Sequence, residues 1–249
     1  MAGIANAHVE ANLPNPTVSS AVNRAIDGCK RICPTVSDRR LPITLDLMRH
    51  LKDSIRLTAV SHYEQRLIWC IFTTAFFAAL RVSEFVSPSP SKYDERSTLL
   101  ISDILENDPS MTLTIRQSKT DQFGHGYRIA LHATGRSVCP VTALRNYIAA
   151  RKSSNLHALP LFVQENGQFV TRTHVDRWLL THLRGIPEKH RYGTHSFRIG
   201  AASTAASHGA SEATIQRIGR WKSSCYARYV RTAVPTHALD AYGQSSGLG

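Results

Sequence analysis

The chain has 249 residues, with 30 Lys and Arg against 18 Asp and Glu, so its net charge is +12. Hydrophobic residues make up 42% of the sequence, which excludes a wholly disordered chain and fits one large domain. The longest apolar run, residues 67–80, is too short for a membrane span, which needs about 20 residues. The N-terminus lacks the basic start and apolar stretch of a signal peptide.

The cysteines favour neither a disulfide framework nor a zinc site. They are odd in number and scattered, which indicates a reducing compartment: Cys29, Cys33, Cys70, Cys139 and Cys225. Cys29 and Cys33 are four residues apart, but no second Cys or His pair near them completes a tetrahedral zinc site. We therefore expect no structural metal.

The basic excess is concentrated near the C-terminus. Residues 170–231 hold 11 Lys and Arg against 3 Asp and Glu, a net charge of +8, whereas the rest of the chain carries +4. This clustering favours a partner of dense negative charge, and nucleic acid is the leading class.

Apolar spacing predicts helices in the first third of the chain. After a loose polar tail over residues 1–15, helical spacing covers residues 17–32 and ends before Pro34. Two more helices are expected over residues 43–57 and 63–80. The second is apolar on most faces and should be central to the core.

The spacing then changes to alternation, which predicts strands over residues 99–104, 111–116 and 127–132. The glycine-bearing loop 117–126 joins the last two as a hairpin, so we expect an antiparallel sheet of two or three strands. This loop carries Lys119.

Helices return in the last part of the chain. The helix that begins at His195, with Thr194 as its cap, is rich in small residues that let another backbone approach closely. Gly209 ends it, and Ser211 caps the next helix. The remaining predicted helices cover residues 140–152, 173–183, 212–218 and 225–231.

Several short segments carry side chains suited to phosphodiester chemistry, although each is weak evidence alone. His195 and Arg198 are three residues apart on a helix and share one face, where a guanidinium can clamp a phosphate beside a proton-carrying imidazole. Arg81 ends an apolar helix. Glu84 either forms a structural pair with Arg81 or orients it at a cleft.

A lysine and a tyrosine complete the candidate set. Lys119 at a hairpin tip is usually solvated, but a loop lysine can act as a general acid because it can lose its proton. A tyrosine in a basic helix is either core or a nucleophile, and both Tyr226 and Tyr229 are available.

In chain order the sequence reads ALRVSE from residue 79, SKT from 118, HSFR from 195, GRW from 219 and RY from 228. This ordered set resembles the catalytic domain of tyrosine recombinases, also called the phage-integrase family, over residues 39–232. The phrasing THSFRIGAASTAA and IGRWKSSCYARYVR looks most like the recombinases of eukaryotic mobile elements, the DIRS/Ngaro retrotransposons and Cryptons.

The resemblance implies an α+β, mainly helical fold with a small antiparallel sheet at one edge. It divides the chain into a tail with the last helix of a truncated core-binding domain (1–35), the catalytic domain (36–232) and a C-terminal tail (233–249). Family members carry a complete core-binding domain that closes the DNA clamp. We therefore expect this chain to be a fragment or the product of a shortened gene.

The resemblance also implies a mechanism. Tyr229 would attack a DNA phosphodiester and form a 3′-phosphotyrosine, while Arg81 and Arg198 stabilise the phosphate charge. Lys119 would protonate the leaving 5′-oxygen, and His195 would assist proton handling at the tyrosine. Attack by another strand's 5′-hydroxyl completes the exchange, so no cofactor and no metal are needed.

Further roles are implied for the C-terminal region. Many family members carry His where Trp221 stands and some carry Trp, whose indole N–H can donate to a phosphate; a plain core Trp fits equally. Tyr229 matches the family spacing from His195 better than Tyr226 does. Expected DNA contacts are Arg172, Arg177, Arg217, Arg220, Lys222 and Arg228.

The implied partner is double-stranded DNA, bound by four protomers on two duplexes, with no membrane and no small-molecule substrate. The tail after Thr232, with Leu239 and Tyr242, would dock on a neighbouring protomer. The compartment would be the nucleus in a eukaryote, and otherwise the cytoplasm or nucleoid.

Two other functions are compatible with the sequence. Gly209 lies between two short helices, and the basic residues after it could form a recognition helix in a DNA-binding module without chemistry. A type IB topoisomerase would use similar tyrosine chemistry. Convergence of Arg81, Lys119, His195, Arg198 and Tyr229 on one phosphate-sized site would favour catalysis over binding alone.

Overall fold

A computed structural model describes residues 2–32, 38–57, 61–118, 121 and 124–231. The chain forms two compact units, residues 1–39 and 40–249. The first unit contains α1 (Ala2–Glu10), a 3-10 turn at Pro16–Val18 and α2 (Ser20–Ile32). The loose tail expected over residues 1–15 is therefore wrong, because this alanine-rich segment is a good helix former. The helix predicted over residues 17–32 is present and begins at Ser20.

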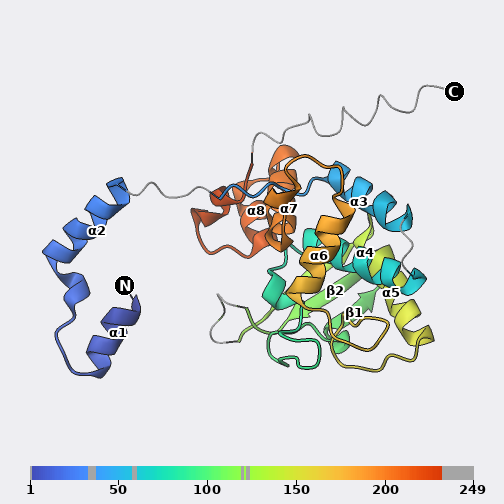
Figure 1. The fold of residues 1–249 in the computed structure, drawn as a ribbon, viewed down its shortest axis with the longest axis horizontal. Helices are drawn as coiled ribbons and strands as arrows, with labels where there is room; N and C mark the ends of the chain where they lie inside the picture. Colours follow the sequence, from blue (N-terminus) through green and yellow to red (C-terminus); the bar gives the residue numbers. More distant parts are fainter. Residues whose placement is uncertain (1, 33–37, 58–60, 119–120, 122–123, 232–249) are drawn as a thin grey trace. The chain divides into compact units, whose positions relative to one another are not determined.

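The second unit is mainly helical (Figure 1). Its helices are α3 (Leu45–Leu57), α4 (His62–Phe77), α5 (Pro140–Ser153), α6 (Arg172–His182), α7 (Thr194–Ser207) and α8 (Glu212–Gly219). Their periodicity predicted all six to within a few residues. None of the described helices is long and apolar enough to cross a membrane.

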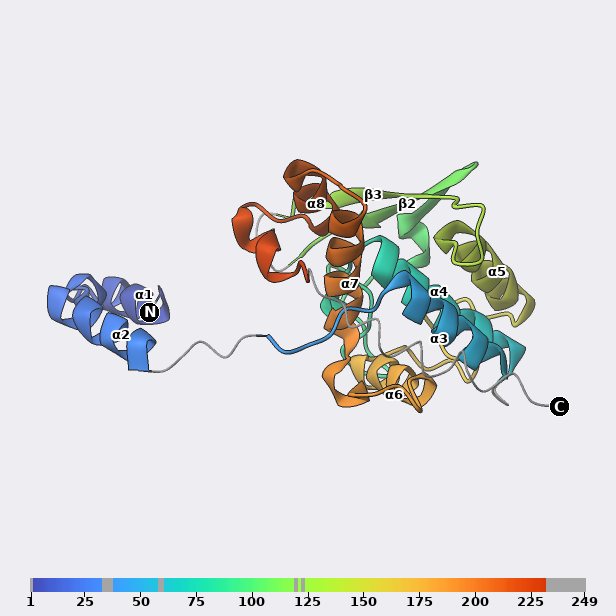
Figure 2. The same ribbon diagram turned by 90° about the horizontal axis from the view of Figure 1, so that it is seen from above.

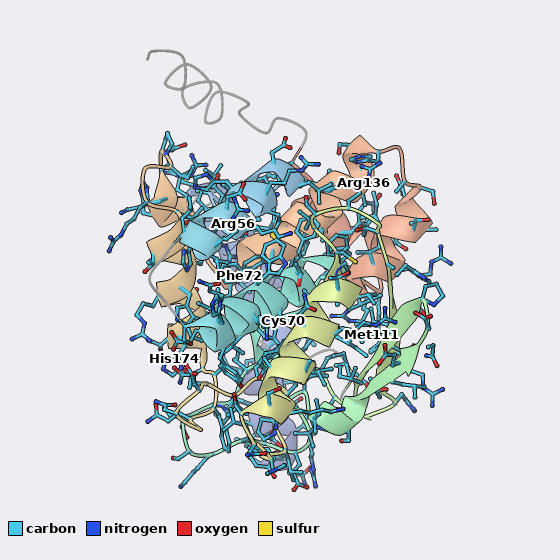
Figure 3. The ribbon with its side chains drawn as sticks, turned by 90° about the vertical axis from the view of Figure 1, so that its right-hand side faces the viewer. Arg56, Cys70, Phe72, Met111, Arg136 and His174 are labelled. Carbon is cyan, nitrogen blue, oxygen red and sulfur yellow. The ribbon has the colours of Figure 1, made fainter. Side chains whose placement is uncertain are left out.

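The α4 helix is the centre of the core, as its all-round apolarity predicted. It packs against both α3 and α5. Figure 3 shows Cys70 and Phe72 of α4 in the middle of the molecule, between Met111 of the sheet and His174 of α6. Phe72 is fully buried and packs on Phe197 of α7, with ring centroids 5.1 Å apart.

A small antiparallel sheet flanks the helices. Its order is β1 (Ile104–Asn107), β2 (Ser110–Ile115), β3 (Tyr127–His132), so β3 lies at one edge. The predicted hairpin of β2 and β3 is confirmed, and the alternate residues Met111, Leu113 and Ile115 are buried.

The strand predicted over residues 99–104 is wrong. A 3-10 turn occupies Ile101–Asp103, and β1 begins only at Ile104. The Asp103 carboxylate accepts the Leu100 backbone N–H at 2.7 Å and the Arg116 guanidinium at 2.7 Å. This side-chain cap closes a turn where the apolar alternation alone predicted extended backbone.

The last predicted helix, residues 225–231, is instead a 3-10 turn at Ser224–Arg228. The Ser223 hydroxyl begins this turn by accepting the Cys225 N–H.

The α7 helix runs between α8 and α6 (Figure 2). The small residues of α7 allow a close approach, as predicted. A Cβ on Gly200 would lie 1.9 Å from the Ile43 carbonyl oxygen.

Gly200→Ala should therefore destabilise the protein by about 1–3 kcal/mol, because the added methyl group forces α7 away from the backbone around Ile43. Urea unfolding followed by circular dichroism measures the change. Thr204→Ala, one turn later on the half-exposed side of α7, is the matched control and should cost far less. Equal losses in both variants would contradict this packing argument.

Candidate active site

An ion-pair network closes the end of α4. Arg81 lies just before the 3-10 turn Val82–Glu84, and Glu84 folds back on it. One carboxylate oxygen of Glu84 accepts the Arg81 guanidinium at 2.9 Å, and the other accepts the Arg81 backbone N–H at 2.9 Å. Arg220, from the end of α8, donates to the second oxygen at 2.7 Å. The expected Arg81–Glu84 pair is thus present, and Glu84 has a second cationic partner.

Arg198 is fully buried beside this network. Its two terminal nitrogens donate to the carbonyls of Ala79 and Gly219. Its guanidinium lies over two aromatic rings, 4.5 Å from the ring centroid of Trp221 and 5.5 Å from that of Tyr229. Burial, and then repulsion from the neighbouring arginines, lowers the pKa of Arg198 to about 10. The group therefore stays charged at neutral pH.

Aromatic contacts bring Tyr229 into the same site. Its ring centroid is 5.1 Å from that of His195 and 4.7 Å from that of Trp221. The Ser203 hydroxyl of α7 donates to the Tyr229 carbonyl at 3.2 Å and accepts the Arg231 N–H at 2.9 Å, which ties this segment to α7.

Local backbone features set these side chains in place. Gly219 must lack a side chain, because a Cβ there would lie 2.0 Å from the Trp221 ring. At the start of α7 the cap is not Thr194, as expected, but Gly193. Asp176 of α6 accepts the Thr194 N–H at 3.1 Å, and this contact fixes the turn that carries His195.

The site contains buried donors that have no hydrogen-bond partner among the described residues. Within the described part of the chain, Nε of Arg198, Nε of Arg220 and Nε1 of Trp221 are buried and have no hydrogen-bond acceptor. Buried polar groups are normally paired, and an unpaired donor costs about 1–3 kcal/mol. Two of these donors, those of Arg198 and Trp221, lie against Tyr229 and are suited to an anion.

Tyr226, the other tyrosine considered as a nucleophile, is part of the hydrophobic core. Tyr226 is buried in a small second core with Ala202, Ile215 and Trp221. A hydrogen bond with the Glu212 carboxylate raises the pKa of Tyr226, since the bond requires the phenol to keep its proton. Tyr226 is therefore a core residue whose phenol donates to Glu212.

Five of the six predicted catalytic residues lie together: Arg81, His195, Arg198, Trp221 and Tyr229. The sixth, Lys119, lies outside the described residues, as do Cys33, Leu239 and Tyr242. The four described cysteines are free thiols. In the ranges that the structure describes, no group of three His, Cys, Asp or Glu side chains could hold a metal ion.

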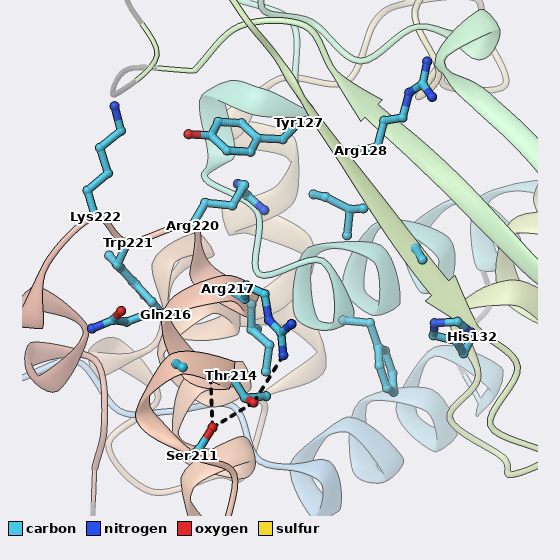
Figure 4. Close-up of a pocket in the computed structure, with 15 residues that line it drawn as sticks. Tyr127, Arg128, His132, Ser211, Thr214, Gln216, Arg217, Arg220, Trp221 and Lys222 are labelled. Atoms are coloured by element: carbon cyan, nitrogen blue, oxygen red, sulfur yellow. Dashed lines mark hydrogen bonds between the residues drawn. The ribbon is translucent and has the colours of Figure 1, made fainter.

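A basic groove of about 1010 Å³ adjoins the arginine cluster, between β3 and α8. We call it the β3–α8 groove; Arg128, Arg217 and Lys222 line it, and Arg220 and Trp221 belong to both groove and cluster (Figure 4). Sequence reasoning selected Arg217 and Lys222 but missed Arg128. Nothing in the sequence near Arg128 shows that β3 faces α8, because only the tertiary fold brings them together.

The other predicted DNA contacts are placed differently. Arg172 pairs with Asp176 on α6 at 3.2 Å, and neither Arg172 nor Arg177 lines the groove. Arg228 is exposed at the end of the last 3-10 turn. Arg220 is almost fully buried, so it cannot act as an exposed side chain of a recognition helix.

No family model matches this sequence. The chain is 29% identical over 223 residues to an integrase/recombinase XerD homolog from Selenomonas ruminantium, and the match covers 84% of this chain but 59% of that protein. The chain thus spans about three fifths of its curated relative.

Solved structures show the same fold. The XerA recombinase superposes with a TM-score of 0.58 at 19% identity, covering 87% of this chain and 66% of that one. A lambda integrase dimer bound to a core site superposes with a TM-score of 0.54 at 14% identity, covering 92% and 63%. The chain therefore has the tyrosine recombinase catalytic-domain fold. The sequence similarity to the XerD homolog agrees with this fold.

Glu84→Gln should destabilise the protein by about 3–5 kcal/mol, because it leaves the buried Arg220 without its anionic partner. Glu106→Gln breaks an exposed pair with Arg145 and serves as the control, with an expected loss of about 1 kcal/mol or less. Urea unfolding of both variants at pH 7 measures the two free energies. A Glu84→Gln loss as small as that of the control would contradict the role given to this carboxylate.

Proposed function

We propose that this chain is the catalytic part of a site-specific DNA recombinase or integrase that acts through a covalent 3′-phosphotyrosine. The observation that carries the proposal is the set of buried, unpartnered N–H groups of Arg198 and Trp221, which lie against Tyr229 in a cluster of guanidiniums. A DNA phosphodiester is an anion whose oxygens can accept hydrogen bonds from these N–H donors. A module that only binds DNA would not require this convergence.

The bond changes follow from these residues. The Tyr229 oxygen attacks phosphorus, the bond from phosphorus to the 5′-oxygen breaks, and a 3′-phosphotyrosine forms. We assign the tyrosine's proton to His195, whose ring contacts Tyr229, and the proton for the leaving 5′-oxygen to Lys119. Arg81 and Arg198 offset the charge on the phosphate in the transition state. The reverse attack by another strand's 5′-hydroxyl restores a phosphodiester.

The proposed reaction also implies a partner and an assembly. We propose double-stranded DNA as the partner, with four protomers on two duplexes during exchange. The IGRWKSSCYARYVR segment supports an origin in a mobile element of the DIRS/Ngaro or Crypton type, which in a eukaryote would act in the nucleus. We propose that residues 1–35, with α2, belong to a core-binding domain of this family.

The test of the chemistry is covalent capture. A nicked duplex that loses its short 5′-hydroxyl fragment after cleavage should trap the wild-type protein as a covalent adduct. Tyr229→Phe should abolish the adduct, whereas Tyr226→Phe should retain it in proportion to folded protein. Denaturing gels with labelled DNA measure the yield. An adduct that survives Tyr229→Phe would refute this assignment.

A plasmid assay distinguishes the recombinase from a topoisomerase. Relaxation of a supercoiled plasmid without any specific site would indicate a topoisomerase instead.

The β3–α8 groove should contact DNA phosphates next to the reacting one, because Arg217 and Lys222 extend the positive surface beyond the arginine cluster. Arg217→Gln should weaken binding at every sequence and reduce the slope of log K against log salt by about one. Arg56→Gln, on α3 and outside the groove, is the charge-matched control. Fluorescence anisotropy between low and moderate salt measures both slopes. Equal slopes for Arg217→Gln and wild type would exclude the groove as a phosphate contact.

A further inference from the structure

Arg220 spans the space between α8 and the end of α4. It is the residue after α8, in left-handed backbone at φ +55°, and its side chain is 5% exposed. The guanidinium donates to the Ala78 carbonyl at 2.9 Å, the Ala79 carbonyl at 3.4 Å and the Glu84 carboxylate at 2.7 Å. Burial lowers the pKa of Arg220, so keeping this charge inside the protein has a cost.

The contacts of Arg220 lead to both candidate phosphate-binding arginines. Glu84 uses one oxygen for the Arg81 guanidinium and the other for Arg220 together with the Arg81 backbone N–H. The Ala79 carbonyl accepts from both Arg220 and Arg198. Arg220 therefore fixes the rotation of the carboxylate that orients Arg81, and it shares an anchor with Arg198.

Charge gives Arg220 a second effect. With Arg220 present, the single negative charge of Glu84 is divided between two cations. Without Arg220, the carboxylate would pair with Arg81 alone and would compete with a phosphate for it. The Arg81 side chain is 19% exposed, whereas the Glu84 side chain is 1% exposed, so Arg81 is the more accessible partner for a ligand.

From these contacts we infer that Arg220 is a positioning residue: it holds Glu84 so that Arg81 is presented to the phosphate with its charge available. This inference rests on the proposed function. In this role Arg220 acts through Glu84 and Arg81 rather than on the duplex, in contrast to its expected place among the DNA-binding side chains.

The experiment measures single-turnover cleavage of the nicked duplex at saturating DNA. Arg220→Met should slow adduct formation by about 30-fold or more, since small misplacements of a catalytic group have effects of this order. The dissociation constant for DNA should change by less than about threefold, because Arg220 acts through Arg81 rather than on the duplex. Arg220→Lys should recover part of the rate.

Arg151→Met is the matched control. Arg151 is also a buried arginine held by carbonyls, with donors to Leu156 at 3.0 Å and Pro160 at 2.6 Å, but it has no contact with the site. The Arg151→Met substitution should lower the unfolding temperature without slowing DNA cleavage by the folded protein. If Arg220→Met does not fold, Arg220→Lys carries the comparison, with a smaller loss of rate expected.

A double-mutant cycle separates positioning from a general structural role. In an Arg81→Lys background, Arg220→Met should slow cleavage by no more than about threefold further, because the group on which it acts is gone. An undiminished effect in that background would overturn the inference.

Side-chain NMR provides a readout that needs no activity. The Arg81 guanidinium N–H resonance should shift in Arg220→Met and stay in place in Arg151→Met. If the wild type forms no adduct, the proposed function fails and the resonance alone decides the positioning role. An unchanged Arg81 resonance in Arg220→Met would overturn the role.

Discussion

The contact between Glu84 and its two arginines is the constraint on which the site depends. It joins the end of α4, the centre of the core, to the end of α8. The chain leaves α4 through Ala79, in left-handed backbone at φ +44°, and the carbonyls of Ala78 and Ala79 become acceptors for Arg198 and Arg220. A buried carboxylate and main-chain oxygens thus allow guanidiniums to remain inside the protein.

The positive charge of the arginine cluster is only partly neutralised by Glu84, which leaves the cluster suited to bind an anion. Glu84 pairs with Arg81 and Arg220, while Arg198 is held by carbonyls and aromatic faces and keeps a lowered pKa of about 10. The remaining positive charge and the unpaired N–H groups make the cluster complementary to an anion. Because Tyr229 packs on Arg198, a phosphate bound there would be adjacent to the phenol.

Much of this arrangement could be predicted from the sequence, and the failures have physical causes. The α3 helix was predicted because its strong apolar period reports burial directly, and α4 was predicted because it is apolar on most faces. The turn at residues 101–103 was missed because one Asp103 cap outweighs an alternating pattern. The buried role of Arg220 was missed because its partner, Glu84, is 136 residues away in the sequence. Of the predicted site, only the position of Lys119 lies outside the described residues.

Mass spectrometry of the trapped adduct tests most directly whether Tyr229 becomes joined to DNA. After nuclease and protease digestion, we expect a nucleotide attached through phosphate to the peptide that contains Tyr229. A nucleotide on Tyr226, or on any other residue, would contradict it.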